Sequence, residues 1–135
     1  MPVNHAEFIV LGAGPGGYAC AFRAADLGLN VTLVDPRADL GGVCLNEGCI
    51  PSKSLLHAAE VIREARHVGD WGISFGEPKI DLDQLREKKN GIVKHLTDGL
   101  TGLAKRRKVS VVRGTASFTG PTGLEIDGAA WSFDQ

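Results

Sequence analysis

The chain has 135 residues, a length typical of one domain, and its 43% hydrophobic and 23% charged residues are ordinary globular usage. Fifteen Lys and Arg against sixteen Asp and Glu give a net charge of −1, which argues against a protein built around nucleic acid or an anionic membrane. Apolar runs are far shorter than the ~20 residues of a membrane helix, and residues 1–7 lack the features of a secretory signal, so we expect a soluble, cytoplasmic protein.

The first predicted elements form a strand–helix–strand unit. Residues 8–11 are a short apolar run bounded by glycine, as in a buried parallel strand. Residues 18–27 are rich in helix-forming side chains and are followed by helix-stopping residues. Residues 31–34 form a second strand that ends at Asp35. This order predicts a right-handed βαβ unit over about residues 6–35.

Two long helices and several short strands are predicted next. The first helix covers about residues 41–66, with a disturbance near Gly48 and Pro51. The second covers about residues 81–105, where apolar side chains recur with a period near 3.6. Short apolar segments separated by turn residues then predict an antiparallel β-meander over about residues 109–133. These segments are residues 109–112, 115–118, 124–126 and 131–133.

The fold class expected from this order is α/β, with a Rossmann-like βαβ unit, two long helices and a meander. One βαβ unit plus a meander is an incomplete doubly wound sheet, and the chain stops directly after the last predicted strand. We therefore expect residues 1–135 to be a partial domain, the N-terminal piece of a longer protein.

Glycine is enriched, with 18 residues, and three glycines form a dinucleotide-binding pattern. Gly12, Gly14 and Gly17 give G-x-G-x-x-G between a strand and a helix, where the helix N-terminus favours a pyrophosphate. Asp35, at the end of the second strand, can accept hydrogen bonds from ribose hydroxyls. The pattern does not separate FAD from NAD, although Asp35 disfavours the 2′-phosphate of NADP. The alternative is a tight turn in an α/β sheet without a ligand.

Cys44 and Cys49 form a close pair that indicates redox chemistry. In an ideal helix, residues five apart lie ~7.5 Å apart along the axis and about 140° around it, which is unsuitable for a disulfide. A bridge therefore needs a local distortion, which Gly48 and Pro51 can provide, and a strained disulfide suits exchange. A helix N-terminus and Lys53 would lower thiol pKa values and favour the thiolate.

Other interpretations of the cysteines stay open at this point. A metal site needs four ligands, but Cys20 is the only other thiol and His57 lies outside ordinary zinc-finger spacing, so no metal is expected. Two inert buried cysteines are the second alternative. Cys20 itself lies inside the first helix and is expected to be a small core residue.

Residues 12–17 and 41–53 together resemble the flavoprotein pyridine nucleotide-disulfide oxidoreductases, specifically their dihydrolipoamide dehydrogenase branch. The Cys-x4-Cys-x3-Lys block is highly specific to this superfamily, and residues 50–53, Ile-Pro-Ser-Lys, resemble the lipoamide branch. The resemblance extends through residues 54–59, 75–78 and 114–118 and so covers nearly the whole chain. It implies an N-terminal part of an FAD-binding domain.

The resemblance also implies roles for individual residues. Cys44 would be the interchange thiol, and Cys49 would lie beside the flavin as its charge-transfer partner. Asp35 would bind the adenosine ribose, although glutamate is common at this position and aspartate has a shorter reach. The cofactor-binding residues implied are Gly12, Gly14, Gly17, Asp35, Pro36, Arg37, Gly41, Gly42, Val43, Cys44, Lys53 and Ala116.

The activity implied is oxidation of dihydrolipoamide through the Cys44–Cys49 disulfide and tightly bound FAD, with NAD as the final acceptor. In such enzymes the NAD site, a further FAD-contacting segment and a dimerisation domain with a His–Glu pair lie outside the region that these residues represent, so turnover by this chain alone is not expected. The implied partners are a lipoyl-bearing acyltransferase or glycine-cleavage lipoyl protein and a second copy in a homodimer. The alternatives are a sibling NADPH-dependent disulfide or mercuric reductase and a stand-alone dinucleotide-binding redox sensor.

Overall fold

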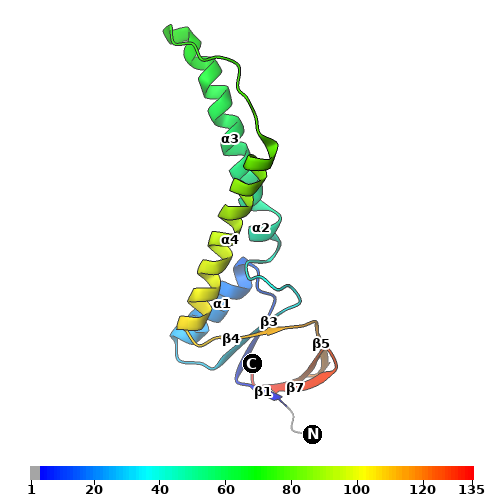
Figure 1. The fold of residues 1–135 in the computed structure, drawn as a ribbon. Coiled ribbons are helices and arrows are strands. Elements are labelled where there is room, and N and C mark those ends of the chain that lie inside the picture. Colours follow the sequence, from blue (N-terminus) through cyan, green and yellow to red (C-terminus); the bar gives the residue numbers. More distant parts are fainter. Residues whose placement is uncertain (1–3) are drawn as a thin grey trace.

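A parallel sheet joins three segments that are far apart in the sequence (Figure 1). The computed structural model describes residues 4–135, so residues 1–3 of the predicted domain lie outside the described residues. Strands β2 (Phe8–Leu11), β3 (Val31–Asp35) and β4 (Ser110–Arg113) pair in the order β2-β3-β4. All five residues of β3 are buried, as expected for the central strand of a parallel sheet covered on both faces.

One face of this sheet is covered by helices. Helix α1 (Pro15–Asp26) connects β2 to β3, and helix α4 (Leu82–Arg106) leads into β4. Their apolar side chains form one core with residues of β3, and Arg107 ties the two helices together through Asp26, 3.0 Å away. The buried members are Ala13, Ala21, Phe22, Ala24, Val31, Leu33, Leu40, Ala104 and Val109. The βαβ unit and the α/β class are therefore confirmed.

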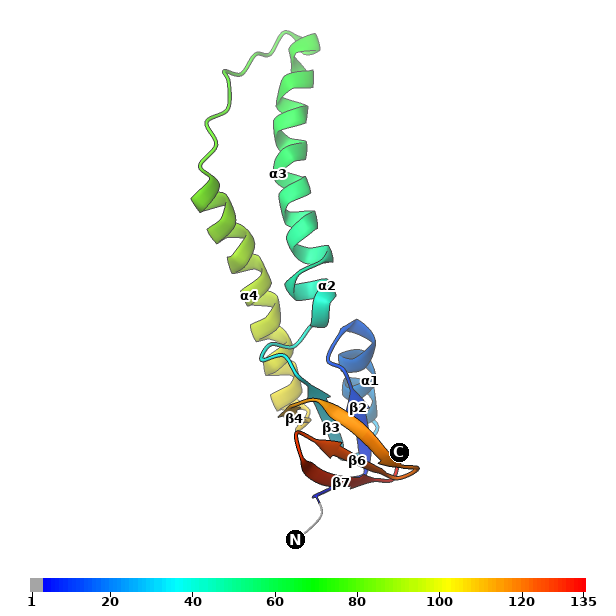
Figure 2. The same cartoon turned by 90° about the vertical axis from the view of Figure 1, so that its right-hand side faces the viewer.

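A second sheet covers the opposite face (Figure 2). Strands β5 (Ala116–Gly120), β6 (Gly123–Ile126) and β7 (Ala129–Phe133) form an antiparallel meander, and β1 (Asn4–Ala6) pairs in parallel with β7. Val34 of β3 packs on this sheet in a second, smaller core. The chain thus forms three layers, with helices, parallel strands and meander in that order.

The predicted meander over residues 109–133 is wrong in its first strand. Strand β4 pairs with β3 in the parallel sheet, with Val112 opposite Val34, and the meander contains only β5, β6 and β7. A short apolar strand has the same local pattern in either setting, so the sequence could not reveal its partner. The crossover through α4 returns the chain beside β3, and that placement decides the pairing.

A long helical arm projects from the three layers (Figures 1 and 2). It contains α2 (Gly42–Asn46), α3 (Cys49–His67), the short 3-10 helix η1 (Val68–Trp71) and the first half of α4. Helix α3 has no buried residue over its full length. Among the helices within residues 4–135, none combines the length and the apolar character needed to cross a membrane.

Replacement of Gly17 by alanine should destabilise this fold. A Cβ at Gly17 would lie 1.7 Å from the carbonyl oxygen of Gly12, which the backbone cannot relieve without moving the turn. We expect a loss of about 1–3 kcal/mol or more in the free energy of unfolding, measured by chemical denaturation. The matched control is Gly91→Ala in α4, where a Cβ meets open space and the gain in helix propensity is up to ~1 kcal/mol. Equal stability of the two variants would contradict the packing argument.

Candidate redox and dinucleotide site

The glycine turn lies between β2 and α1, at the carboxyl end of the parallel sheet. Gly12 adopts a left-handed φ of 98°, and its N–H donates to the carbonyl of Val34 at 2.7 Å. Gly14 is the N-cap of α1, and Gly17 lies against the Gly12 carbonyl. A Cβ at Gly14 or at Gly16 would meet open space. The turn therefore offers bare backbone at a helix N-terminus, the arrangement that receives a pyrophosphate.

The carboxylate of Asp35 holds two loops by their backbones. Its Oδ2 accepts from the N–H of Ala13 at 2.7 Å, and its Oδ1 accepts from the N–H of Arg37 at 2.8 Å. Asp35 is only 8% exposed, so both bonds form in a largely dry environment. Sequence reasoning placed this carboxylate near a ribose and did not anticipate its role inside the protein. The two bonds fix the glycine turn relative to the loop that follows β3.

The segment that carries the cysteines is tied directly to the glycine turn. The carbonyl of Ala13 accepts from the N–H of Gly41 at 2.9 Å. Gly42 packs so closely on the turn that a Cβ there would lie 2.7 Å from the Cα of Gly14. Gly41 and Gly42 both have positive φ values, 111° and 61°. These glycines thus permit the close approach of two loops that sequence reasoning had assigned to one cofactor.

The two cysteines lie on either side of a helix break. Helix α2 ends at Asn46, Glu47 is its C-cap, Gly48 is the N-cap of the next helix, and Cys49 is the first residue of α3. The single helix predicted over residues 41–66 is therefore wrong, and the expected disturbance is a complete break. Its cause is Gly48, because a proline at the third position of a helix needs no backbone donor and is tolerated there.

The thiols of Cys44 and Cys49 are free and interact with each other. A side-chain hydrogen bond to Cys49, together with burial and charge repulsion between the thiolates, raises the pKa of Cys44 above its ordinary value. The backbone N–H of Cys49 and the charge of Lys53 lower this pKa, but by less. The expectation of a lowered pKa is therefore wrong for Cys44. The proximity of a second thiol outweighs the helix N-terminus.

Sequence reasoning missed two side chains that shape the cysteine segment. Asn46 Nδ2 donates to the carbonyls of Leu40 at 3.2 Å and Gly42 at 2.9 Å, which fastens α2 to the loop before it. Glu47 pairs with the guanidinium of Arg37, 2.7 Å away. The i,i+4 spacing of Gly42 and Asn46 and the opposite charges of Arg37 and Glu47 were the only signals available.

The remaining predicted site residues are less closely grouped. Pro36 follows β3 on the surface, Val43 in α2 is 58% exposed, and Lys53 is exposed in the first part of α3. Ala116 begins β5 and packs beside Val34 in the second core.

Cys20 is exposed, so its prediction as a core residue is wrong. Helix α1 buries Ala21, Phe22 and Ala24, and Cys20 lies outside the arc that these three side chains span around the helix.

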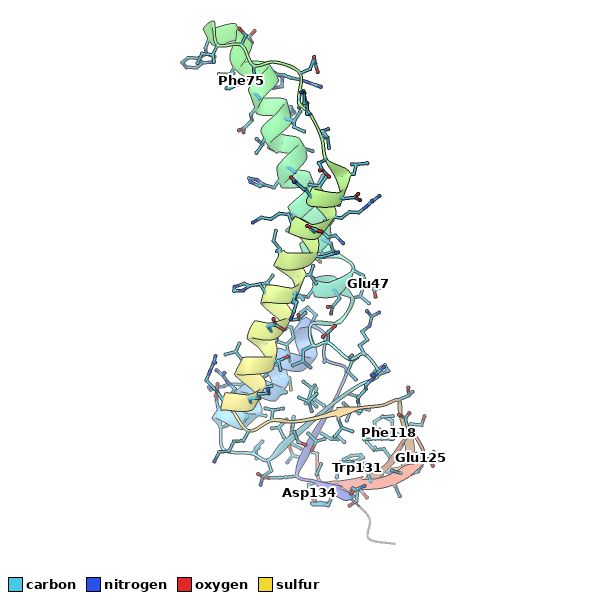
Figure 3. The ribbon with its side chains drawn as sticks, in the orientation of Figure 1. Glu47, Phe75, Phe118, Glu125, Trp131 and Asp134 are labelled. Carbon is cyan, nitrogen blue, oxygen red and sulfur yellow. The ribbon has the colours of Figure 1, made fainter. Side chains whose placement is uncertain are left out.

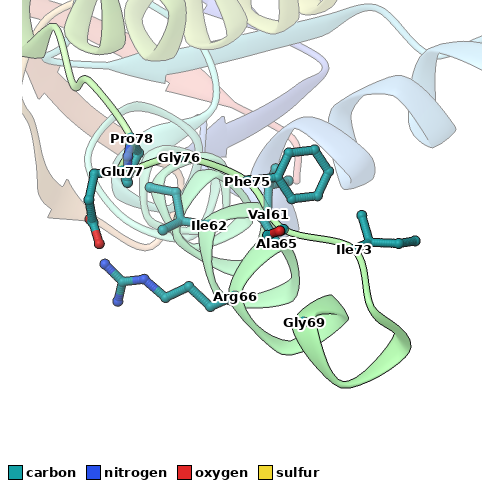
Figure 4. A pocket seen from close by; sticks show the side chains of 11 residues that line it. Val61, Ile62, Ala65, Arg66, Gly69, Ile73, Phe75, Gly76, Glu77 and Pro78 are labelled. Atoms are coloured by element: carbon teal, nitrogen blue, oxygen red, sulfur yellow. The ribbon is translucent and has the colours of Figure 1, made fainter.

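A hollow of about 580 Å³ lies at the tip of the arm, away from the cysteines (Figure 4). It is lined mainly by apolar side chains of α3 and of residues 73–78, with Arg66 and Glu77 directed toward each other at one side. Cys49 begins α3 and Arg66 lies near its end, which separates them by about 26 Å of helix. The hollow is therefore not part of the dithiol site.

Comparison with known families assigns the chain. The model of the pyridine nucleotide-disulphide oxidoreductase family matches residues 6–135. The chain belongs to this family. The match includes both the glycine turn and the cysteine segment, so the two features that the structure joins also belong to one family pattern.

Individual relatives in the family are similar over most of the chain. A dihydrolipoyl dehydrogenase of Vibrio cholerae is 56% identical over 123 residues, which cover 91% of this chain and 26% of the relative. A protein of the same name from Haemophilus influenzae is 58% identical over 113 residues, 84% of this chain and 24% of the relative. One from Thermus scotoductus is 46% identical over 125 residues, 93% of this chain and 27% of the relative. The chain spans about a quarter of the length of these curated relatives.

The buried bonds of Asp35 predict a loss of stability in Asp35→Asn. The amide nitrogen of asparagine cannot accept a hydrogen bond, so one of the two backbone N–H groups loses its partner, at a cost of about 1–3 kcal/mol. The denaturation midpoint should fall accordingly. Asp70→Asn, an exposed aspartate in η1, is the control and should change stability by no more than about 0.5 kcal/mol. Similar midpoints for both variants would refute the assigned bonds.

The raised pKa of Cys44 predicts the pH dependence of its alkylation. Cys49→Ala removes the hydrogen-bonding thiol and the repelling charge, so the pKa of Cys44 should fall. The Cys44 thiolate should then form at lower pH. The rate of Cys44 alkylation by iodoacetamide, followed by peptide mass spectrometry across a pH series, measures this shift. A midpoint that stays constant or rises in Cys49→Ala would show that Cys49 does not raise the pKa.

Proposed function

We propose that this chain is the FAD-binding and dithiol-bearing part of a dihydrolipoyl dehydrogenase. The observation that carries the proposal is the direct connection of the cysteine segment to the glycine turn through Gly41 and Ala13. This hydrogen bond fixes the position of the thiol pair relative to the loop that would bind a dinucleotide. A stand-alone nucleotide-binding domain does not require such a connection. The names and similarity of the relatives add support for the lipoamide branch.

The described residues fit the ADP half of FAD at the glycine turn. Open space above Gly14 and Gly16 leaves room for phosphates at the N-terminus of α1, where no acidic side chain lies in the first turn. Strand β3 ends at Asp35 beside this turn and Pro36 follows it, the place where a ribose is proposed to bind. The further residues proposed to line the cofactor are Gly12, Gly17, Arg37, Gly41, Gly42, Val43, Cys44, Lys53 and Ala116.

The cysteines carry the exchange step of the proposed reaction. A thiolate of dihydrolipoamide attacks Sγ of Cys44 in the Cys44–Cys49 disulfide, and Cys49 leaves as a thiolate at the N-terminus of α3. The second substrate thiolate attacks the substrate sulfur of the mixed disulfide, and Cys44 leaves. The substrate thus loses two electrons to the protein disulfide, and the two protons of its thiols pass to the cysteine thiolates or to water. When bound, FAD supplies the group that receives these electrons and passes them to NAD.

The proposal extends to partners and cell compartment. Its substrate is a lipoyl group on an acyltransferase of a 2-oxoacid dehydrogenase complex or on a glycine-cleavage protein, and its NAD site lies outside this chain. The protein acts as a homodimer in the cytoplasm. Exposed apolar side chains on the arm support contact with further protein. Helix α3 has no buried residue in this structure, and most helices in proteins depend on tertiary packing for their stability. Those side chains are Leu55, Leu56, Val61, Trp71, Ile73, Phe75, Ile80 and Leu82.

Serine substitutions test the dithiol role. In the full-length protein, Cys44→Ser and Cys49→Ser should each lower the rate of NAD reduction by dihydrolipoamide by about 10³-fold or more, because the exchange step loses a sulfur. The visible absorbance of bound flavin should remain in both variants. Cys20→Ser is the matched control, since this exposed cysteine on α1 should leave the rate unchanged.

Two results would count against this function. Near-normal turnover of Cys44→Ser or Cys49→Ser would remove the disulfide from the reaction. Turnover of glutathione disulfide or mercuric ion with NADPH, without any of dihydrolipoamide with NAD, would assign the protein to a sibling reductase.

A further inference from the structure

An ion pair between Arg37 and Glu47 lies at the helix break between the two cysteines. Arg37 Nη1 lies 2.7 Å from Oε1 of Glu47, and its Nη2 lies 3.5 Å from Oε2. Glu47 is the C-cap of α2, and its N–H donates to the carbonyl of Val43 at 2.8 Å. Figure 3 shows Glu47 beside α2, at the base of the arm and far from Phe75 at its tip. One partner of the pair, Glu47, therefore belongs to the turn that leads from Cys44 to Cys49.

The backbone of Arg37 is held in place by a hydrogen bond. The N–H of Arg37 donates to the buried carboxylate of Asp35, whose other oxygen holds the glycine turn at Ala13. The backbone of Arg37 cannot shift without breaking this partly buried hydrogen bond. Glu47 is thus held to the frame of the glycine turn.

The other side of the break is held by α3. Both the N–H and the hydroxyl of Ser52 donate to the carbonyl of Gly48, at 3.1 Å and 2.8 Å. The break is also crowded, because a Cβ at Gly48 would lie 3.3 Å from the Cα of Cys44. The two residues of the break are therefore held by different parts of the structure. Gly48 is bonded to α3, which carries Cys49, and Glu47 is paired with Arg37 in the loop after β3.

We propose that the ion pair between Arg37 and Glu47 positions the turn so that the thiols of Cys44 and Cys49 stay ready to close a disulfide. The inference rests on the proposed redox role of the two cysteines. Without the pair, the turn gains freedom in the dithiol form and must be ordered again when the bond forms. The equilibrium between disulfide and dithiol should then shift toward the dithiol. Glu47 and Arg37 are positioning residues and do not take part in the exchange.

The expected effect is small and measurable. The side chains of the pair are 36% and 63% exposed, and exposed pairs change equilibria by about two- to fivefold. For a two-electron couple, in which a tenfold change corresponds to 29.6 mV, this shift equals about 9–21 mV toward easier reduction.

A redox titration of the full-length protein, with the cofactor it carries, tests the proposal. The protein is equilibrated with mixtures of reduced and oxidised dithiothreitol, and free thiols are alkylated. The tryptic peptide that reports both cysteines covers residues 38–53, or residues 24–53 in proteins with Arg37→Gln. Reduction breaks the bond between the two Sγ atoms and takes up two electrons and two protons, as dithiothreitol closes to its cyclic disulfide. In Glu47→Gln, the ratio of disulfide to dithiol should fall two- to fivefold.

Three comparisons separate the ion pair from a general loss of structure. Adding Arg37→Gln to Glu47→Gln should cause little further change, because the single variant already removes the pair. In 1 M salt, where the Debye length is about 3 Å, the wild-type protein should approach Glu47→Gln. Asp83→Asn breaks an exposed pair of the same kind with Arg86 on α4 and should leave the ratio unchanged.

An unchanged ratio in Glu47→Gln, or a shift toward the disulfide, would overturn the inference. It would also be overturned if Arg37→Gln lowered the ratio as much in the Glu47→Gln protein as in the wild type. In these cases the wild-type protein still forms the disulfide, and the proposed function stands. If the wild-type peptide never loses the two hydrogens of a disulfide, the proposed function fails together with this inference.

Discussion

The peptide group of Ala13 connects the main parts of this structure. Its N–H donates to the buried carboxylate of Asp35, and its carbonyl accepts from Gly41. Ala13 is completely buried, so water cannot replace either hydrogen bond. A backbone group left without its partner there would lower the free energy of unfolding. Through this one peptide, the end of β3, the glycine turn and the start of the cysteine segment have a common position. The chemistry proposed for the chain depends on that alignment.

Glycines make the alignment sterically possible. Gly17 lies against the carbonyl of Gly12, and Gly42 lies against the Cα of Gly14, at distances that exclude any side chain. Each contact brings two backbones together, while Gly16 in the first turn of α1 stays exposed. An open dinucleotide cradle and a closely packed cysteine segment are thus consequences of the same small residues.

The environment of the thiol pair depends on a helix that stops and restarts. Because α2 ends before Glu47 and α3 begins at Cys49, the two thiols interact although four residues separate them in the sequence. This proximity also raises the pKa of Cys44, against the influence of the α3 N-terminus and Lys53. For Cys44, the effect of the neighbouring thiol on the pKa exceeds that of the α3 N-terminus and Lys53.

Local patterns were sufficient for several of the elements. The periodicity of α4, the apolar runs of β2 and β3, and the spacing of Gly12, Gly14 and Gly17 each depend on residues close in the sequence. Partners distant in sequence were not predictable in this way. The placement of β4 beside β3, the exposure of Cys20 and the pairing of Arg37 with Glu47 depend on how separate elements meet.

The sequence by itself determined the α/β class, the glycine turn, the close cysteine pair and the family to which they belong, because these features are short-range patterns with a direct steric or chemical meaning. Only the tertiary structure decided that Asp35 holds the glycine turn through the N–H of Ala13 and that the cysteine segment rests on that turn. The physical reason is that a hydrogen bond or a close contact across 22 or more residues depends on the packing of the whole sheet, which no local pattern records.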